Sequence, residues 1–211
     1  MLLRDHTLTQ FTEVLSSGTP APGGGAAAAL SGALAASLVA MTGALTVTKE
    51  KYKEYHAEIQ GIMDRADQLR ENLLAGVDED TEAYGRVAAV FKMPKADPGQ
   101  KASRAEAMQE ALKGAAIPPL EAMRLALACV ELAYRSYGKI NASCASDLGV
   151  AALCGLACVK SAWLNVKINL ASVRDKEFID KILPEACDML DKAEKLAGEI
   201  YQKIEAEIPQ P

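Results

Sequence analysis

The sequence predicts an all-α protein, a bundle of about eight helices around a central buried helix rich in alanine and glycine. Apolar residues recur at spacings of three and four along almost the whole chain, and no run of alternating β-branched residues indicates a strand. Half of the residues are hydrophobic but only 5% are aromatic, a composition typical of closely packed helices. No linker, low-complexity tract or repeat divides the 211 residues, so one domain is expected over residues 1–211.

The first half of the chain predicts four helices. A short amphipathic helix at 7–16 presents Leu8, Phe11, Val14 and Leu15, and an uncharged helix follows at 26–47. A longer, charged helix begins near residue 49 and runs to about 74; its inward positions are Ile59, Ile62, Met63, Ala66 and Leu69. A separate helix is expected from 77 to 93, with Tyr84, Val87, Ala88 and Phe91 on its apolar face.

The second half predicts four more helices, at 101–115, 120–137, 144–172 and 175–206. Pro118 and Pro119 are expected to break or kink the chain between the first two, because proline lacks a backbone N–H and clashes with the preceding turn. Gly138 to Ser143 forms a loop, and Pro184 marks a local irregularity in the last helix.

The uncharged segment opens with Pro20-Ala21-Pro22-Gly23-Gly24-Gly25, which predicts a tight loop leading directly into the alanine-rich helix. The unpaired N–H groups at the start of that helix can bind an anion, so the loop is a candidate ligand site. The alternative is that the loop serves only as a turn. One face of this helix carries leucine, and the opposite face carries alanine and glycine, which allow neighbouring helices to approach closely. This segment is long enough to span a membrane. However, no aromatic residues flank it and no other segment of the chain is comparably apolar, so a buried helix of a soluble protein is favoured. In one interpretation this helix lies at a subunit interface.

Composition excludes several function classes. The net charge of −5 and the absence of an arginine-rich run argue against a nucleic-acid partner, and no basic start followed by a short apolar core indicates a signal peptide. Five cysteines without secretory context favour a reducing compartment, so a cytoplasmic protein is expected. Cys154 and Cys158 share a helix face, but no histidine lies nearby in sequence, and buried apolar thiols are favoured over a metal site.

Two further clusters carry polar chemistry. Four carboxylates, among them Asp78 and Asp80, lie between Val77 and Tyr84; they either complement a helix start or place one acid in the apolar interior. In the second cluster, Ser146 and Asp147 cap or precede a helix on which Asn165 and Asn169 later share one face. Buried asparagines need hydrogen-bond partners, so this pair either links helices or presents amides to a ligand.

With these motifs the chain resembles the cyclodeaminase/cyclohydrolase family of folate one-carbon metabolism. The resemblance covers nearly the whole chain and rests on five motifs: the Pro-Ala-Pro-Gly-Gly-Gly loop, Lys49-Glu50-Lys51-Tyr52, the Asp78/Asp80-to-Tyr84 turn, Ser146-Asp147 with Gly149-Val150-Ala151-Ala152, and Asn165-Val166-x-Ile168-Asn169-Leu170. Two positions depart from the family pattern: Ala26 replaces a common serine, and Lys139 a usual asparagine.

The resemblance implies an all-helical homodimer that binds folate without a metal, and a methenyltetrahydrofolate cyclohydrolase activity. A formimidoyltetrahydrofolate cyclodeaminase is the alternative, and a noncatalytic folate-binding or interaction module is a second one. The expected catalytic residues are Asp147 with Asp80 or Asp78. Substrate contacts are expected from Gly23, Gly24, Gly25, Asn165, Asn169, Ser146, Lys49 and Lys51, with the lysines meeting the glutamate tail, a role open also to Lys53 and Lys160.

Overall fold

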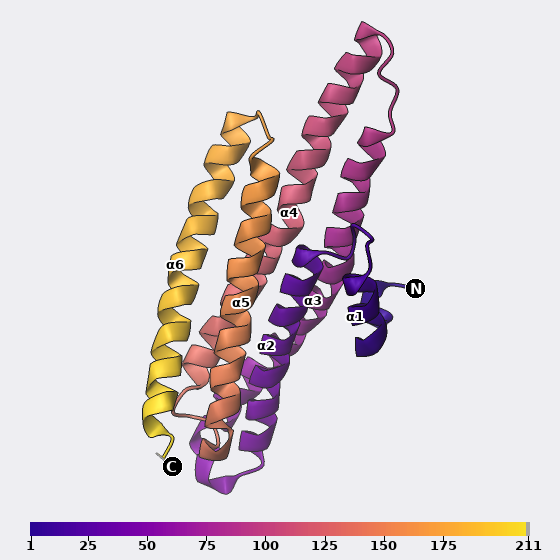
Figure 1. Ribbon diagram of the computed structural model, residues 1–211. Helices are drawn as coiled ribbons and strands as arrows, with labels where there is room; N and C mark the ends of the chain where they lie inside the picture. Colours follow the sequence, from indigo (N-terminus) through magenta and orange to yellow (C-terminus); the bar gives the residue numbers. More distant parts are fainter. Residues whose placement is uncertain (210–211) are drawn as a thin grey trace.

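The computed structural model describes residues 1–209, and in this range the chain is helical and contains no strand. Six α-helices follow one another: α1 (Leu8–Ser16), α2 (Gly24–Val47), α3 (His56–Phe91), α4 (Pro98–Ser136), α5 (Ala145–Leu170) and α6 (Lys176–Glu207). The short 3₁₀ turns η1 (Leu3–Asp5), η2 (Glu50–Tyr55) and η3 (Ala142–Cys144) lie between or before them. The five long helices run side by side, and α1 lies across the outside of the bundle (Figure 1). The predicted all-α fold is confirmed.

The small-residue face of α2 is buried, as the sequence predicts. Helix α2 packs on α3, α4 and α5, and its buried positions are almost all glycine, alanine or threonine. A Cβ on Gly32 would lie 2.8 Å from a Leu73 methyl, and one on Gly43 would lie 2.5 Å from Met63 Cγ. The two glycines therefore set how closely α2 and α3 approach.

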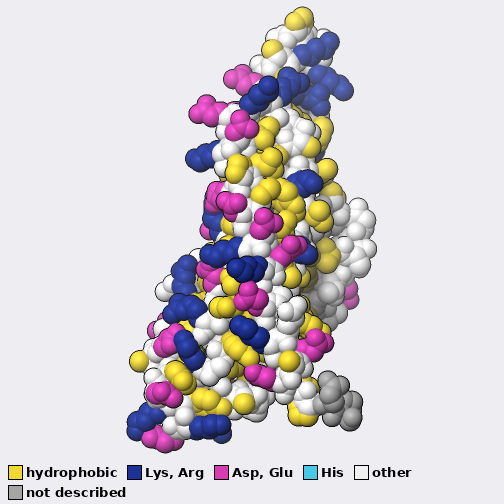
Figure 2. All heavy atoms as spheres, turned by 90° about the vertical axis from the view of Figure 1, so that its left-hand side faces the viewer, with side chains coloured by type: hydrophobic (Ala, Val, Ile, Leu, Met, Phe, Trp, Pro, Cys, Tyr) yellow, Lys and Arg dark blue, Asp and Glu magenta, His cyan; other side chains and the backbone are white. Residues whose placement is uncertain are grey.

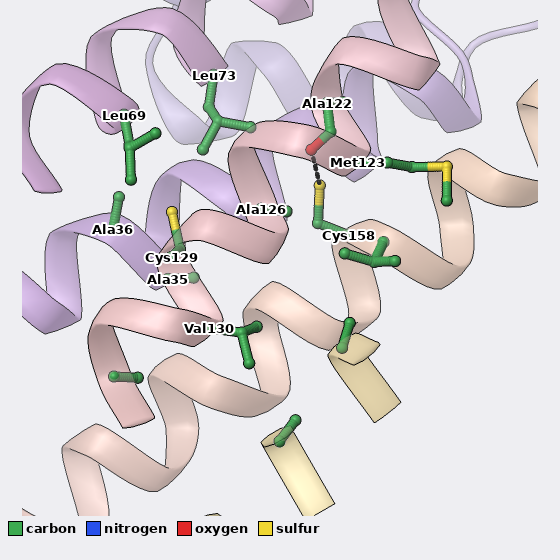
Figure 3. Packing of buried hydrophobic residues seen from close by; sticks show 14 of the residues in the cluster. Ala35, Ala36, Leu69, Leu73, Ala122, Met123, Ala126, Cys129, Val130 and Cys158 are labelled. Atoms are coloured by element: carbon green, nitrogen blue, oxygen red, sulfur yellow. Dashed lines mark hydrogen bonds between the residues drawn. The ribbon is translucent and has the colours of Figure 1, made fainter. Parts of the chain in front are cut away.

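The centre of the bundle is apolar, and all five long helices contribute buried side chains to it. Figure 3 shows part of this packing. Leu69 and Leu73 of α3 meet Ala35 and Ala36 of α2, with α4 and α5 closing the other sides. The Cys158 thiol of α5 donates a hydrogen bond to the Ala122 carbonyl of α4, which satisfies its weak donor inside the core. Burial raises the pKa of Cys158 to about 12, so this thiol stays protonated. The interpretation of Cys158 as a buried apolar residue agrees with this environment.

The prediction of about eight helices is wrong, because two expected breaks are absent. Helix α3 continues through Gly76, and residues 50–55 form the turn η2, so that α3 begins only at His56. Helix α4 continues through both Pro118 and Pro119, and α6 through Pro184. Pro119 leaves the carbonyl of Ala115 without its usual N–H partner, and Asn169 Nδ2 of α5 supplies one at 2.8 Å. Tertiary hydrogen bonding thus offsets part of the cost of an interior proline.

The molecule has two conspicuous surface features. Helices α2 and α5 leave an apolar face exposed, formed by Leu34, Met41 and Leu45 of α2 and by Val150, Leu153, Leu164 and Ile168 of α5. Both helices are long and apolar enough to cross a membrane, with the same mean hydropathy of 1.7, so the prediction that no second segment is comparably apolar is wrong. About half of each helix is buried inside the bundle, and core helices of soluble proteins have the same length and apolar composition. Figure 2 shows the second feature, a group of Lys and Arg side chains at the upper end of the molecule.

Candidate functional site

A cavity of about 260 Å³ lies where the start of α2 meets the end of α5, the last third of α3 and the middle of α4. Its lining combines the glycine loop with one carboxylate, two amides and a tyrosine: Pro20, Ala21, Gly23, Gly24, Gly25, Asp80, Ala83, Tyr84, Val87, Leu112, Ala115, Asn165 and Asn169. The cavity therefore brings together six of the predicted site residues, which lie up to 146 positions apart in the sequence. It is large enough for a flat heterocycle but smaller than a typical pocket that encloses a whole ligand of drug size.

The carboxylate of Asp80 lies against the N-terminus of α2. Gly23 is the N-cap and has no side chain to satisfy the first N–H groups, and the Ala26 N–H faces the Asp80 carboxylate. A Cβ on Gly25 would lie 2.0 Å from Asp80 Oδ1, so only glycine allows this approach. The anion at this helix start is thus a carboxylate of the protein itself, held by the partial positive charge of the helix.

Burial raises the pKa of Asp80 above its usual value of 3.8, and the hydrogen bond from the Ala26 backbone opposes part of that rise. The environment is partly apolar because Ala83 and Val87 flank the carboxylate on α3, and Leu112 approaches from α4. A carboxyl whose pKa is moved toward neutrality by desolvation suits proton transfer. No other aspartate or glutamate lines this cavity.

The two asparagines, Asn165 and Asn169, both bind backbone carbonyls through their amide nitrogens, which leaves their amide oxygens for a ligand. Asn169 links helices through its amide N–H to the Ala115 carbonyl, whereas Asn165 donates to Ser161 of its own helix at 2.9 Å. Each uses its amide nitrogen in this way, and neither Oδ1 has a hydrogen-bond partner within residues 1–209. Both side chains line the cavity, so two amide oxygens remain to accept hydrogen bonds from a ligand or a water.

Replacing Asn169 by Ala is expected to lower the free energy of unfolding by about 1–3 kcal/mol, because the Ala115 carbonyl loses its donor. Pro119→Ala restores a backbone N–H to that carbonyl, so the same Asn169→Ala change should cost clearly less in the Pro119→Ala background. Urea unfolding of the wild type, both single variants and the double variant measures the coupling. Additive effects in this cycle would contradict the assigned role of Asn169.

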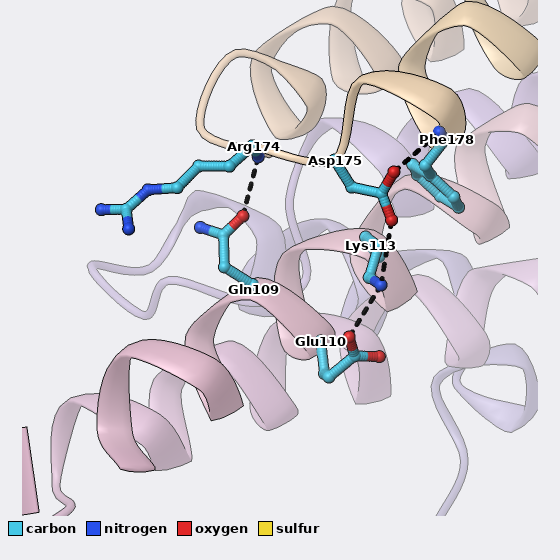
Figure 4. A network of polar contacts seen from close by, with 6 residues as sticks. All are labelled: Gln109, Glu110, Lys113, Arg174, Asp175 and Phe178. Atoms are coloured by element: carbon cyan, nitrogen blue, oxygen red, sulfur yellow. Dashed lines mark hydrogen bonds and ion pairs between the residues drawn. The ribbon is translucent and has the colours of Figure 1, made fainter. Parts of the chain in front are cut away.

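A polar network beside the cavity fixes α4 to the connection between α5 and α6 (Figure 4). Gln109 accepts from the Arg174 N–H at 2.7 Å and donates to the Ser172 carbonyl at 3.1 Å. Lys113 of α4 lies between Glu110 and Asp175, and Asp175 also caps α6 by accepting from the Phe178 N–H. The network holds the α4 turn that contributes Leu112 and Ala115 to the cavity.

The family model described as formiminotransferase-cyclodeaminase matches residues 7–188. The chain belongs to this family. A methenyltetrahydrofolate cyclohydrolase from Methylorubrum extorquens is 36% identical over 204 residues, which cover 97% of this chain and 98% of that protein. The formimidoyltransferase-cyclodeaminase of Mus musculus is 31% identical over 208 residues, but the chain spans only 38% of its length. The crystal structure of a formiminotetrahydrofolate cyclodeaminase from Thermotoga maritima superposes with a TM-score of 0.87 at 25% identity, covering 97% of this chain and 98% of that one.

Other residues that the resemblance to the formiminotransferase-cyclodeaminase family singled out lie away from this cavity. Asp78 is on a different face of α3, where it accepts from the Leu3 N–H at 2.6 Å and lies 3.5 Å from Arg4 Nε. That carboxylate anchors the N-terminal segment and is not among the residues that line the cavity with Asp80. Lys139, one of the two departures from the family pattern, pairs with Glu58 at 2.7 Å and lowers the pKa of that carboxyl.

Asp147 and Ser146 lie in the first turn of α5, whereas Asn165 and Asn169 lie near its end. Eighteen residues of helix separate Asp147 from Asn165, a distance of about 27 Å along the axis. Lys49 and Lys51 follow the C-terminus of α2, about 35 Å from the glycine loop at its start. Within one chain the structure therefore does not bring these four residues together with Asp80.

Sequence reasoning missed the contribution of α4. Leu112 and Ala115 line the cavity opposite Asp80, and nothing in their immediate sequence distinguishes them from core residues. The adjacent Pro118-Pro119 pair was the available signal, because a carbonyl freed by proline needs a donor from a neighbouring helix. Within residues 1–209 no group of three or more His, Cys, Asp or Glu side chains could hold a metal ion, and a metal-free site stays a prediction.

Proposed function

We propose that the chain is a methenyltetrahydrofolate cyclohydrolase, which hydrolyses 5,10-methenyltetrahydrofolate to 10-formyltetrahydrofolate. The observation that carries the proposal is the partly desolvated Asp80 carboxylate in a cavity lined by amide oxygens. The full-length similarity to the Methylorubrum extorquens cyclohydrolase supports the choice of substrate.

The substrate is a cation, with its charge spread over N5, the bridging carbon and N10. A carboxylate in a partly apolar cavity attracts such a cation more strongly than it would in water. This attraction is strongest before water adds, so it contributes to binding more than to rate. The contribution to rate comes from the same carboxylate as a general base: Asp80 accepts one proton of the water that attacks the bridging carbon. The C–N5 bond of the resulting adduct then breaks as its hydroxyl proton passes to N5, which leaves the formyl group on N10, and Asp80 releases the proton it accepted to solvent.

The asparagines and the glycine loop complete this arrangement. The free Oδ1 atoms of Asn165 and Asn169 accept hydrogen bonds, either from N–H groups of the pteridine or from the attacking water. Gly24 leaves room beside Asn165, since a Cβ there would lie 3.7 Å from its Nδ2. The ring system can therefore approach the backbone of the loop closely.

Cyclodeaminase activity is the second candidate, favoured by the relatives from Mus musculus and Thermotoga maritima. Here N10 attacks the formimino carbon and ammonia leaves, and a protonated Asp80 would donate the proton that the leaving amine requires. The raised pKa of Asp80 suits this direction as well. A noncatalytic folate-binding module is the remaining alternative.

One spectrophotometric experiment separates these candidates, because methenyltetrahydrofolate absorbs in the near ultraviolet. Its accelerated loss in the presence of the purified chain is the expected result. Appearance of the same absorbance from formiminotetrahydrofolate would instead identify the cyclodeaminase. Absence of both, with folate binding retained in calorimetry, would leave the binding module and overturn the proposed activity.

We further propose a homodimer that forms through the exposed apolar face of α2 and α5. An exposed stripe of large apolar side chains on two adjacent helices is costly in water and typical of a subunit interface. Twofold symmetry pairs identical surfaces. An antiparallel α5 pair would place Val150 opposite Ile168 and Leu153 opposite Leu164, so the apolar positions match one another. All five cysteines are free, which suits a cytoplasmic protein.

Such a pairing also offers a place for Asp147. It would bring the first turn of the α5 helix in one copy toward the last turns of α5 in the other, near Asn169. Asp147 would then act across the interface with Asp80 of the other chain. Mixing Asp80→Asn chains with Asp147→Asn chains tests this: each alone should be nearly inactive, and the mixture should regain activity. An Asp147→Asn variant with wild-type rates would remove Asp147 from the site.

Leu164→Glu is expected to shift the dimer to a monomer, because it places a charge within the apolar face. Leu183→Glu on α6 is the matched control, since Leu183 is also exposed but lies outside this face. Sedimentation velocity over a range of concentrations gives the oligomeric state of each. A wild-type chain that sediments as a monomer at all concentrations would contradict the proposed dimer.

A further inference from the structure

A second groove lies along the two helices, α3 and α4, that contribute to the Asp80 cavity. This groove, of about 470 Å³, is lined by Phe91, Lys95, Lys101, Arg104, Ala105 and Met108. Val87 of the cavity and Phe91 of the groove lie four residues apart on α3, and Leu112 and Met108 lie four apart on α4. Residues at that spacing share one helix face and are about 6 Å apart. The groove is therefore one helical turn from the cavity and opens on the same side.

The charge of this region contrasts with that of the whole chain. Residues 84–104 form the end of the α3–α4 arm and carry five basic residues and one acidic residue, whereas the chain has a net charge of −5. Figure 2 shows these Lys and Arg side chains gathered at the upper end of the molecule. Within residues 1–209, Lys95, Lys101 and Arg104 form no ion pair, since the only acid here, Asp97, caps α4 by accepting from the Gln100 N–H. Their charge is thus available to an anion.

Arg104 is also held in place. Its Nε donates to the Val90 carbonyl at 3.1 Å and its Nη2 to the Phe91 carbonyl at 3.4 Å, so the guanidinium closes the C-terminal turn of α3. Phe91 is 63% exposed beside it. An ordered guanidinium next to an exposed aromatic ring suits a ligand that is apolar on one side and carries carboxylates at intervals.

We infer that this groove binds the glutamate chain of the folate, with Lys95, Lys101 and Arg104 contacting its carboxylates. The inference rests on the proposed function. From Asp80 to Phe91 the α3 axis rises about 16 Å. The benzoyl group and the first glutamate of the substrate occupy this span, and additional γ-linked glutamates reach the cations. The groove therefore selects for tail length, whereas the Asp80 cavity recognises the reacting ring.

The experiment compares monoglutamyl and triglutamyl 5,10-methenyltetrahydrofolate. We expect the wild type to have a KM about fivefold lower for the triglutamate, as a few exposed charge pairs provide. Lys95→Gln/Lys101→Gln should abolish most of this ratio, and raising the ionic strength should weaken the wild-type preference. The control Lys181→Gln/Lys195→Gln removes two exposed charges from α6 and should keep the ratio. Arg104 is left intact because it also caps α3.

Two outcomes overturn the inference: a wild-type KM that does not depend on tail length, or a preference that survives in Lys95→Gln/Lys101→Gln. Calorimetric binding of pteroylmonoglutamate and pteroyltriglutamate gives the same comparison without catalysis. A chain that hydrolyses nothing but binds the triglutamate more tightly, and loses this preference in the variant, would refute the proposed activity and support the groove. Equal binding of both compounds by an active enzyme would do the reverse.

Discussion

Asp80→Asn is expected to lower kcat/KM for methenyltetrahydrofolate by about 100-fold or more. The amide cannot accept the proton of the attacking water, and it carries no charge to attract the cationic substrate. Both contributions depend on the position of the carboxylate in the cavity between α2, α3 and α5. Steady-state hydrolysis rates measure the effect. Glu82→Gln is the matched control, because Glu82 is an exposed acid on the same helix outside the cavity.

The same substitution should make the protein more stable at neutral pH. Burial raises the pKa of Asp80 in the folded state above 3.8, so the folded chain binds this proton more tightly than the unfolded chain. Stability from this group is therefore greatest at acid pH and falls as the pH rises from 3.8 through the raised folded pKa. The Asp80→Asn variant has no carboxyl group to ionise at this position, so it does not lose stability in this way as the pH rises. Urea unfolding at several pH values should show a stabilisation at pH 7 that disappears near pH 3.8.

A variant that loses activity and gains stability is difficult to explain by damage to the fold. If Asp80→Asn were less stable than the wild type at pH 7, the carboxylate would be a structural partner of α2 rather than a strained functional group. Wild-type hydrolysis by Asp80→Asn would remove Asp80 from the mechanism altogether. In the wild type, kcat/KM should also fall at acid pH with an apparent pKa above 3.8, as the base becomes protonated.

Gly25→Ala is expected to reduce kcat/KM nearly as much as Asp80→Asn, although it adds only a methyl group. The new Cβ would lie 2.0 Å from Asp80 Oδ1, so the carboxylate must leave its position at the start of α2. Gly24→Ala provides the matched comparison, because its Cβ would make an ordinary contact of 3.7 Å with Asn165. Both changes replace glycine in the same helical turn, so differences in helix propensity are small.

Hydrolysis rates and thermal unfolding of the two glycine variants give the answer together. The expected pattern is a large loss of activity for Gly25→Ala and a much smaller one for Gly24→Ala, with both chains folded. Equal activities would show that the position of Asp80 against the α2 N-terminus is not required. A crystal structure of Gly25→Ala should show the Asp80 side chain turned away from Ala26.

The helical fold class was predictable from the sequence because apolar residues recur at spacings of three and four along almost the whole chain. The small-residue face of α2 is an example, because Gly32 and Gly43 lie where α3 approaches too closely for a Cβ atom. The number of helices was not predictable from local signals. Gly76 and the Pro118-Pro119 pair resemble breaks, yet packing on neighbouring helices keeps α3 and α4 continuous. The hydrogen bond from Asn169 to Ala115 is a tertiary contact that no local pattern contains.

The residues that line the cavity were predictable where several sequence motifs pointed to the same place. They were less predictable where the only signal was the type of side chain. The glycine loop, Asp80 and the two asparagines do line one cavity. Asp78 has the same side chain as Asp80 only two positions away, but a helix turns these positions to different faces, and Asp78 binds the N-terminal segment. Asp147 and the lysines at 49 and 51 lie at the far end of the bundle, because α2 and α5 run in opposite directions with their lengths fixed by the fold. The part of Asp147 in the reaction remains a prediction about two copies of the chain.

The negative charge held at the first turn of α2 would also distinguish the reactant from the product of the proposed reaction. Before the reaction the ligand carries a positive centre that neutralises this charge, and afterwards the formyl product is neutral at that position. In the proposed reaction the empty protein and the product-bound protein therefore both leave the Asp80 carboxylate without a cationic partner, so Asp80 attracts the reactant but not the product, whereas the contacts with the glutamate tail are common to both. The chemical step thus removes one of the attractions that hold the ligand, and product release becomes easier than release of the unreacted substrate.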